Sequence, residues 1–129
     1  MNFDNLTTKS REALMRAQQI AREYSHPQID VLHLLLALLQ EKEGLIISVL
    51  ARLGVDDAKL REIISNALRV LPRLVSNIPL GQLYLSQNMA RVFEKAMAEA
   101  KRMGDDYISV EHLLLAIVME EGIIADALR

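Results

Sequence analysis

The sequence predicts an all-α domain, and three observations support this prediction. Apolar residues recur at intervals of three and four along several segments, which is the spacing of one buried helix face. Ser, Thr or Asp precedes most of these segments, as helix N-caps do. The segment QIDVLHLLLAL at 28–38 returns as YISVEHLLLAI at 107–117, which indicates an internal repeat.

The repeat extends beyond that shared segment. Residues 6–41 align with residues 85–120 without a gap, and 11 of these 36 positions are identical. The aligned register begins just before a hydroxyl residue and runs through a shared histidine, so leucine-rich composition alone does not explain it. We predict two pseudo-symmetric repeats, the first at about 1–75 and the second at about 84–129, joined by a linker at about 72–83.

The first repeat is predicted to begin with an amphipathic helix. Thr7 or Thr8 can cap it, its apolar residues keep the three-and-four spacing, and it reaches about Tyr24. Pro27 lies just downstream and is predicted to prevent the helix from continuing. His26, which precedes that proline, is interpreted as a turn residue.

The next predicted helix is short and almost wholly apolar. Asp30 can cap it, and it runs from Val31 to about Lys42. Because it has almost no polar face, we expect it to be buried nearly all round. Two further helices are predicted, one at about 45–53 and one following Asp56 to about residue 71.

The second repeat is predicted to start with a helix that Ser86 caps and Gly104 ends, followed by a helix that Ser109 caps. A counterpart of residues 54–71 is missing, so we expect this chain to stop inside a longer unit. The link at 71–82 contains two prolines and one glycine yet is apolar. It could pack over the core or border an exposed binding surface.

Composition excludes several functional classes. With 129 residues, a formal net charge of −2 and no cysteine, the chain offers neither a basic nucleic-acid or membrane footprint nor thiolate chemistry. The N-terminus lacks a secretory pattern and the longest apolar run has six residues, so a cytoplasmic domain is expected. No Gly-rich phosphate loop precedes a Lys-Ser or Lys-Thr pair, so we expect no ATP hydrolysis and no cofactor.

Two groups of polar residues are candidates for chemistry. His33 and His112 could bind a metal, but each lacks a second ligand at a suitable spacing and each lies three residues after a cap. A hydrogen bond in the first helical turn is therefore the favoured role. Asp105, Asp106 and Glu111 suit a helix start, where negative charge is stabilised, or the rim of a binding site, more than acid–base catalysis.

Four segments in this order resemble a known family. FDNLTTKSREAL at 3–14, IDVLHLLLALL at 29–39, LGV at 53–55 and ISVEHLLLAI at 108–117 are similar to the twin Clp repeats of Clp AAA+ unfoldases and disaggregases. The link LPRLVSNIPLGQLYLSQNM at 71–89 resembles that of the ClpB-type disaggregases. The resemblance implies an all-α, non-catalytic N-terminal domain tethered to ATPase rings that use ATP and Mg²⁺ and assemble as a hexamer.

The resemblance also implies partners and a site. Unfolded or aggregated polypeptides would bind in an apolar groove between the repeats, with a polar rim that carries over to Thr7, Asp105 and Glu111. We assign the groove by position, as a weaker inference, to Phe3, Leu6, Leu83, Tyr84, Leu85 and Val110.

Adaptor docking, as in ClpC- or ClpA-type unfoldases, is the alternative function, and a stand-alone domain that sequesters clients is a third. The ClpC-type domains bind phosphoarginine with the Glu of each Glu-His pair. Glu111 keeps one of these positions but Leu32 occupies the other, which favours the ClpB-type interpretation. We expect the isolated domain to be a monomer that binds neither nucleic acid nor membrane.

Overall fold

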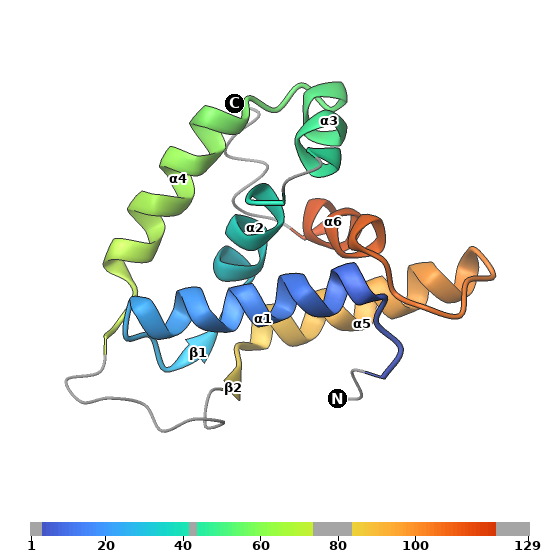
Figure 1. Cartoon of the computed structure of the whole chain (residues 1–129), viewed down its shortest axis with the longest axis horizontal. Coiled ribbons are helices and arrows are strands. Elements are labelled where there is room, and N and C mark those ends of the chain that lie inside the picture. Colours follow the sequence, from blue (N-terminus) through green and yellow to red (C-terminus); the bar gives the residue numbers. More distant parts are fainter. Residues whose placement is uncertain (1–3, 42–43, 74–83, 121–129) are drawn as a thin grey trace.

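The computed structural model describes residues 4–41, 44–73 and 84–120, and within these ranges it contains six helices and two very short strands (Figure 1). The all-α prediction is therefore confirmed. No helix in the described ranges has the length and apolar character needed to cross a membrane. The elements in chain order are α1 (Thr8–Glu23), β1 (Gln28–Ile29), α2 (Val31–Leu39), α3 (Leu45–Arg52), α4 (Asp57–Val70), β2 (Tyr84–Leu85), α5 (Gln87–Arg102) and α6 (Val110–Met119).

The predicted N-caps are confirmed. The hydroxyl of Thr7 accepts from the Ser10 N–H at the start of α1, and the hydroxyl of Ser86 accepts from the Met89 N–H at the start of α5. Such a side-chain acceptor satisfies one of the amides that a helix start leaves unpaired. Asp30, Asp56 and Ser109 cap α2, α4 and α6 in the same way.

Helices α1 and α5 end in the same type of turn. Ser25 and Gly104 adopt left-handed backbone with φ of 58° and 76°, and the next residue donates its N–H back into the helix, from His26 to the Ala21 carbonyl in α1. This is the Schellman arrangement, which ends a helix by itself. Helix α1 therefore ends near Tyr24, as predicted, and this turn ends it before Pro27 is reached. The end of α2 differs from the prediction, since it lies at Leu39 and not near residue 42.

The two repeats match in their first two helices. Helices α1 and α5 have the same length and lie 79 residues apart in sequence, as do the first residues of α2 and α6. The sequence does not predict the strands, and each extended segment pairs with one from the other repeat. Ile29 of β1 pairs in parallel with Leu85 of β2, and Leu6 forms an equivalent parallel bridge to Ile108. Each repeat thus supplies one extended segment to each of two junctions.

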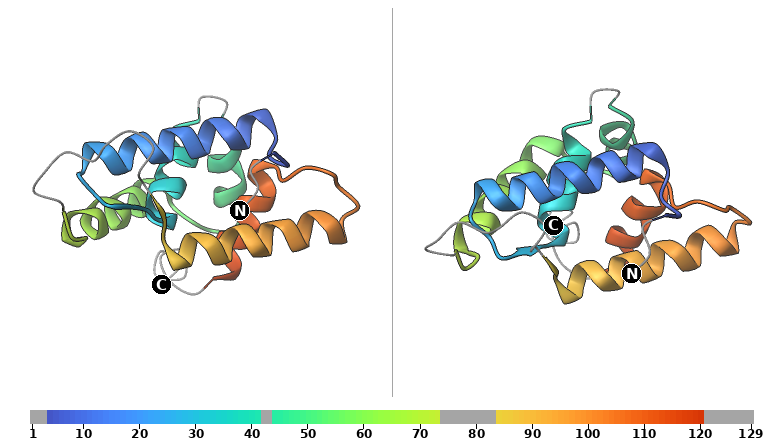
Figure 2. Two further views of the ribbon diagram at one scale, coloured as in Figure 1. Left: turned by 90° about the horizontal axis from the view of Figure 1, so that it is seen from below. Right: turned by 60° about the horizontal axis from the view of Figure 1, so that its bottom comes forward.

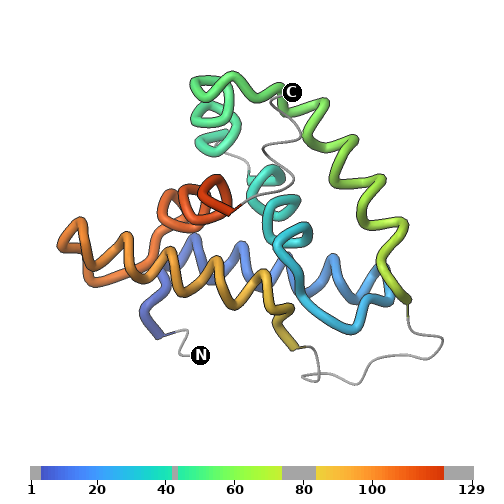
Figure 3. The backbone as a smooth tube through the Cα atoms, turned by 180° about the vertical axis from the view of Figure 1, so that it is seen from behind, coloured from blue at the N-terminus to red at the C-terminus, as the bar shows by residue number. Residues whose placement is uncertain are grey.

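Helices α2 and α6 form the centre of the molecule. Leu34 in α2 and Leu113 in α6 are fully buried, in agreement with the prediction that these apolar helices are covered on nearly all sides. The long helices α1 and α5 run in opposite directions, and both views of Figure 2 show parts of α2 and α6 between them. Helix α2 lies between α6 and α4, so α4 covers the part of α2 that faces away from the second repeat (Figure 3).

Candidate functional site

The two junctions are called corners here. The first corner comprises residues 26–33 with residues 84–86, and the second comprises residues 105–112 with residues 5–7. A pocket of about 460 Å³ opens at the second corner, where the start of α1 meets the turn between α5 and α6. Its lining residues are Thr7, Asp105, Asp106, Tyr107, Ser109, Glu111 and His112.

Backbone pairing holds the second corner together. The Thr7 N–H donates to the Ile108 carbonyl at 3.0 Å, and the Ile108 N–H donates to the Asn5 carbonyl at 2.7 Å. The Ser10 hydroxyl, which is fully buried, donates to the same Ile108 carbonyl at 2.9 Å. These bonds place Thr7 of the first repeat opposite the acidic turn of the second, although about 100 residues separate them in sequence.

His112 orients one carboxylate of the pocket. Its Nδ1 accepts from the Ser109 N–H at 2.9 Å, so the neutral ring carries its proton on Nε2 and donates it to Oδ2 of Asp105 at 3.0 Å. The His112 side chain is 7% exposed, whereas the Asp105 side chain is 51% exposed. The predicted role of His112 at the helix start is confirmed, and the bond to Asp105 adds a second role that sequence reasoning missed.

The pocket is negatively charged and has one exposed aromatic ring. Three carboxylates line it, from Asp105, Asp106 and Glu111, while none of its described lining residues is Lys or Arg. Tyr107 is 56% exposed beside them. Carboxylates and hydroxyls accept hydrogen bonds from peptide N–H groups and cationic side chains, and the ring can cover apolar surface. This surface can therefore bind a polypeptide segment without any bond-making chemistry.

The first corner contains the equivalent residues in a closed arrangement. Its counterpart of the pair Asp105–His112 is the pair His26–His33, whose rings are 1% and 0% exposed with Nδ1 of His26 2.8 Å from Nε2 of His33. The Ser86 hydroxyl donates to Oδ1 of Asp30 at 2.6 Å and joins the two repeats. Asp105 is half exposed at the second corner, whereas the equivalent His26 is buried at the first.

Comparison with known proteins decides the family. The model of the Clp repeat (R) N-terminal domain matches residues 5–129, nearly the whole chain. The chain belongs to the Clp repeat N-terminal domain family. The resemblance inferred from the sequence is therefore confirmed.

The relatives of this Clp repeat domain are much longer proteins. Chaperone protein ClpB of Bacillus cereus is 38% identical over 123 residues, which cover 95% of this chain and 14% of the relative. ClpB of Pseudomonas putida is 37% identical over 122 residues, with the same two coverages. The chain therefore spans about one seventh of the length of these relatives.

Solved Clp-type N-terminal domains share the fold. The N-terminal domain of Hsp104 from Candida albicans superposes with a TM-score of 0.81 at 19% identity, covering 96% of this chain and 79% of that one. The N-terminal domain of the ClpV1 ATPase from E. coli gives a TM-score of 0.80 at 23% identity, covering 98% and 78%. At these sequence identities the comparison shows only that the fold is shared.

The predicted rim and groove residues of the Clp repeats have different positions. All three rim residues, Thr7, Asp105 and Glu111, line the pocket together. The groove residues Leu6, which bridges to Ile108, and Val110, the first residue of α6, are 4% and 5% exposed, so they offer almost no surface.

Two other predicted groove residues, Tyr84 and Leu85, do not line the pocket. Tyr84, which is 70% exposed, and the half-buried Leu85 form β2 and lie at the first corner. Phe3 and Leu83 lie outside the described residues. The assigned residues therefore do not form one continuous apolar groove among the residues that the structure describes.

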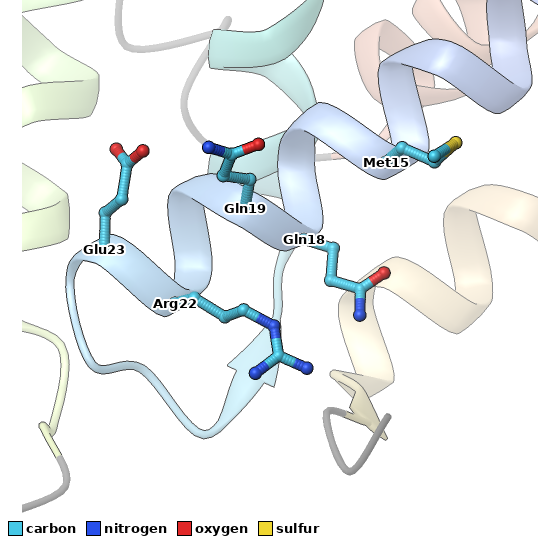
Figure 4. A pocket seen from close by; sticks show the side chains of 5 residues that line it. All are labelled: Met15, Gln18, Gln19, Arg22 and Glu23. Atoms are coloured by element: carbon cyan, nitrogen blue, oxygen red, sulfur yellow. The ribbon is translucent and has the colours of Figure 1, made fainter. Parts of the chain in front are cut away.

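A second pocket lies on the outward side of α1. It measures about 490 Å³, and its described lining, Met15, Gln18, Gln19, Arg22 and Glu23, comes from that helix alone (Figure 4). The side chains of Gln19 and Glu23 point away from those of Gln18 and Arg22. No second element brings a converging group to it in the described residues, so the second corner remains the candidate site.

Metal binding is the alternative role for the histidines. In the part of the chain that the structure describes, no three His, Asp or Glu side chains converge in a way that could hold a metal ion. Each ring nitrogen of His33 and His112 already has a partner within 3.0 Å. Both rings are instead part of capping boxes at the starts of α2 and α6.

Proposed function

We propose that this domain is the client-binding N-terminal domain of a ClpB-type protein disaggregase. Segments of unfolded or aggregated polypeptide would bind at the second corner and pass to the ATPase ring of the same cytoplasmic, hexameric protein, whose other domains would bind ATP and Mg²⁺. The observation that carries the proposal is the pocket at the second corner, which gathers Thr7, Asp105 and Glu111 at one site. The identity to ClpB proteins supports the choice of parent.

The proposed mechanism is weak, reversible binding without catalysis. The Thr7 hydroxyl and the carboxylates of Asp105 and Glu111 would accept hydrogen bonds from an extended segment, while Tyr107 covers an apolar side chain. A micromolar complex corresponds to about −8 kcal/mol, so a few such contacts suffice. Several domains on one hexamer would raise the effective affinity through avidity.

NMR titration of the chain with a permanently unfolded protein tests the proposal. We expect shifts of the Thr7, Asp105 and Glu111 amides, and an affinity about tenfold lower for Glu111→Gln and for Asp105→Asn, since each loses a charged acceptor. The Asn variant keeps an oxygen that accepts from His112, so the corner stays intact. Glu62→Gln on the exposed side of α4 changes the net charge equally and is the matched control.

Three results would contradict the proposal. Shifts confined to α3 and α4 would place the client elsewhere on the domain. Equal losses of affinity for Glu111→Gln and Glu62→Gln would mean that the affinity depends on net charge and not on a site at the second corner. Binding of a folded adaptor, without binding of the unfolded protein, would favour the ClpC- or ClpA-type alternative.

A further inference from the structure

The first corner buries two imidazole rings whose hydrogen bonds require both to be neutral. The Asp30 N–H donates to Nδ1 of His33 at 2.8 Å, so the proton of neutral His33 is on Nε2. That Nε2–H donates to Nδ1 of His26, which must then be unprotonated. A proton added to either ring would point at a hydrogen-bond donor, so the chain from Asp30 through His33 to His26 breaks on protonation.

The surroundings of the pair also disfavour a positive charge. Tyr24 of α1 stacks on His26 with 5.3 Å between ring centroids, and the Arg73 guanidinium lies 5.9 Å from the centroid of Tyr24. Asp30 is the acidic group that faces the pair, and its two oxygens already accept from the Leu32 N–H and the Ser86 hydroxyl. Nε2 of His26 approaches the backbone of Leu68 in α4, outside ideal hydrogen-bond geometry.

The direction of titration follows from this packing. Burial first, and then the neighbouring His26, lower the pKa of His33 from 6.5 to about 4 against the opposing effect of Asp30. Burial also lowers the pKa of His26, as does Arg73, while Leu68 and Asp30 raise it. Because the folded pKa lies below the unfolded one, the stabilisation is complete above pH 6.5 and is lost as the pH falls towards 4.

We propose that the His26–His33 pair is an acid-sensitive latch, whose protonation opens the first corner and loosens the two repeats from each other. The same residues that hold the pair also join the repeats, through the Ser86–Asp30 bond and the pairing of Ile29 with Leu85. At the second corner the His112 Nε2–H faces the carboxylate of Asp105 instead of a second imidazole. The latch is independent of the proposed client binding.

Urea unfolding between pH 7.5 and pH 5 tests the latch in the 129-residue chain. For a His with a pKa of about 4 when folded and 6.5 when unfolded, the unfolding constant rises about 30-fold over this range. His26→Asp recreates the pair of the second corner, because a carboxylate then accepts from Nε2 of His33. We expect this variant to lose most of that rise.

A second variant keeps the test decisive if the buried carboxylate prevents folding. His26→Gln offers a neutral acceptor and removes one titrating ring, so its unfolding constant should rise less than that of the wild type. NMR of the wild-type ring of His33 should show no protonation above pH 5, and the Asp30 and Ser86 amides should shift on further acidification. Parallel losses of stability in the wild type and both variants, or titration of His33 near pH 6.5, would overturn the proposal.

Discussion

At the first corner, Ser86 of the second repeat donates to Asp30 and two buried imidazoles face each other. At the second corner, Thr7 donates to its own helix at Ser10, and His112 faces the half-exposed Asp105. The backbones of the two corners match residue for residue, since capping boxes and parallel pairing are present at both. A few side chains therefore decide whether a corner is closed or open.

The position of one carboxylate is central to that difference. In the first corner it is on the cap residue, Asp30, where the hydroxyl of the other repeat reaches it. In the second corner the cap is Ser109, and the carboxylate lies seven residues before the histidine, at the pocket mouth. A carboxylate at the cap, as at Asp30, bonds the other repeat. A carboxylate in the turn, as at Asp105, lies at a surface that a ligand can reach.

The largest expected effect tests whether the interiors of the two repeats are equivalent. Leu34→Ala and Leu113→Ala each remove a fully buried side chain at matching positions of α2 and α6. We expect each to lower the free energy of unfolding by about 3–4 kcal/mol, as cavities of this kind do. Urea denaturation of both variants measures these two losses in the free energy of unfolding. A loss for Leu113→Ala below half that for Leu34→Ala would mean that the second repeat has a weaker centre.

The next effect concerns the bond that closes the first corner. Ser86→Ala removes both the cap of α5 and the donor to Asp30, and we expect it to lower the free energy of unfolding by about 2 kcal/mol. Thr7→Ala, its counterpart, removes the cap of α1 without a bond to the opposite repeat, and about 1 kcal/mol is expected. Calorimetric unfolding of the two variants compares them. Equal losses would show that the Ser86–Asp30 bond adds nothing to stability.

The smallest effect concerns the turn that ends α1 and α5. Ser25 has a left-handed backbone at φ 58°, where Gly104 stands in the second repeat. Because a Cβ is disfavoured there, Ser25→Gly should raise the free energy of unfolding by up to about 1 kcal/mol, and Gly104→Ser should lower it by a similar amount. Chemical denaturation with both variants at one pH gives the two values. A destabilised Ser25→Gly variant would mean that the serine side chain holds the turn.

The helices and their caps could be predicted from the sequence because both depend on local patterns. Three-and-four spacing marks the buried faces, and a hydroxyl or carboxylate before each segment marks its start. The strands could not, because a two-residue segment has no period to detect and its partner is distant in sequence. The sequence indicates a turn role for His26, yet its ring is buried. Tyr24 stacks on it, and Leu68 of α4, which only the tertiary fold brings near, lies beside it.

The candidate site was predictable only in part. The rim residues came from the family resemblance, and the structure brings them to one pocket. The apolar groove residues were assigned by sequence position, which does not reveal that Leu6 pairs with Ile108 and becomes buried. The alignment of the two repeats does indicate the partners of the shared histidines, since His26 and Asp105 occupy equivalent positions seven residues before them.

The exchange of extended segments also bears on the order of folding. Pairing Ile29 with Leu85 closes a chain loop of 56 residues, whereas pairing Leu6 with Ile108 closes one of 102 residues. Closure entropy grows with the logarithm of loop length, so the longer loop is less favourable by about 0.5 kcal/mol before any other contact forms. The shorter loop therefore has the entropic advantage during folding, and the pocket at the second corner is expected to be among the last parts of the domain to assemble.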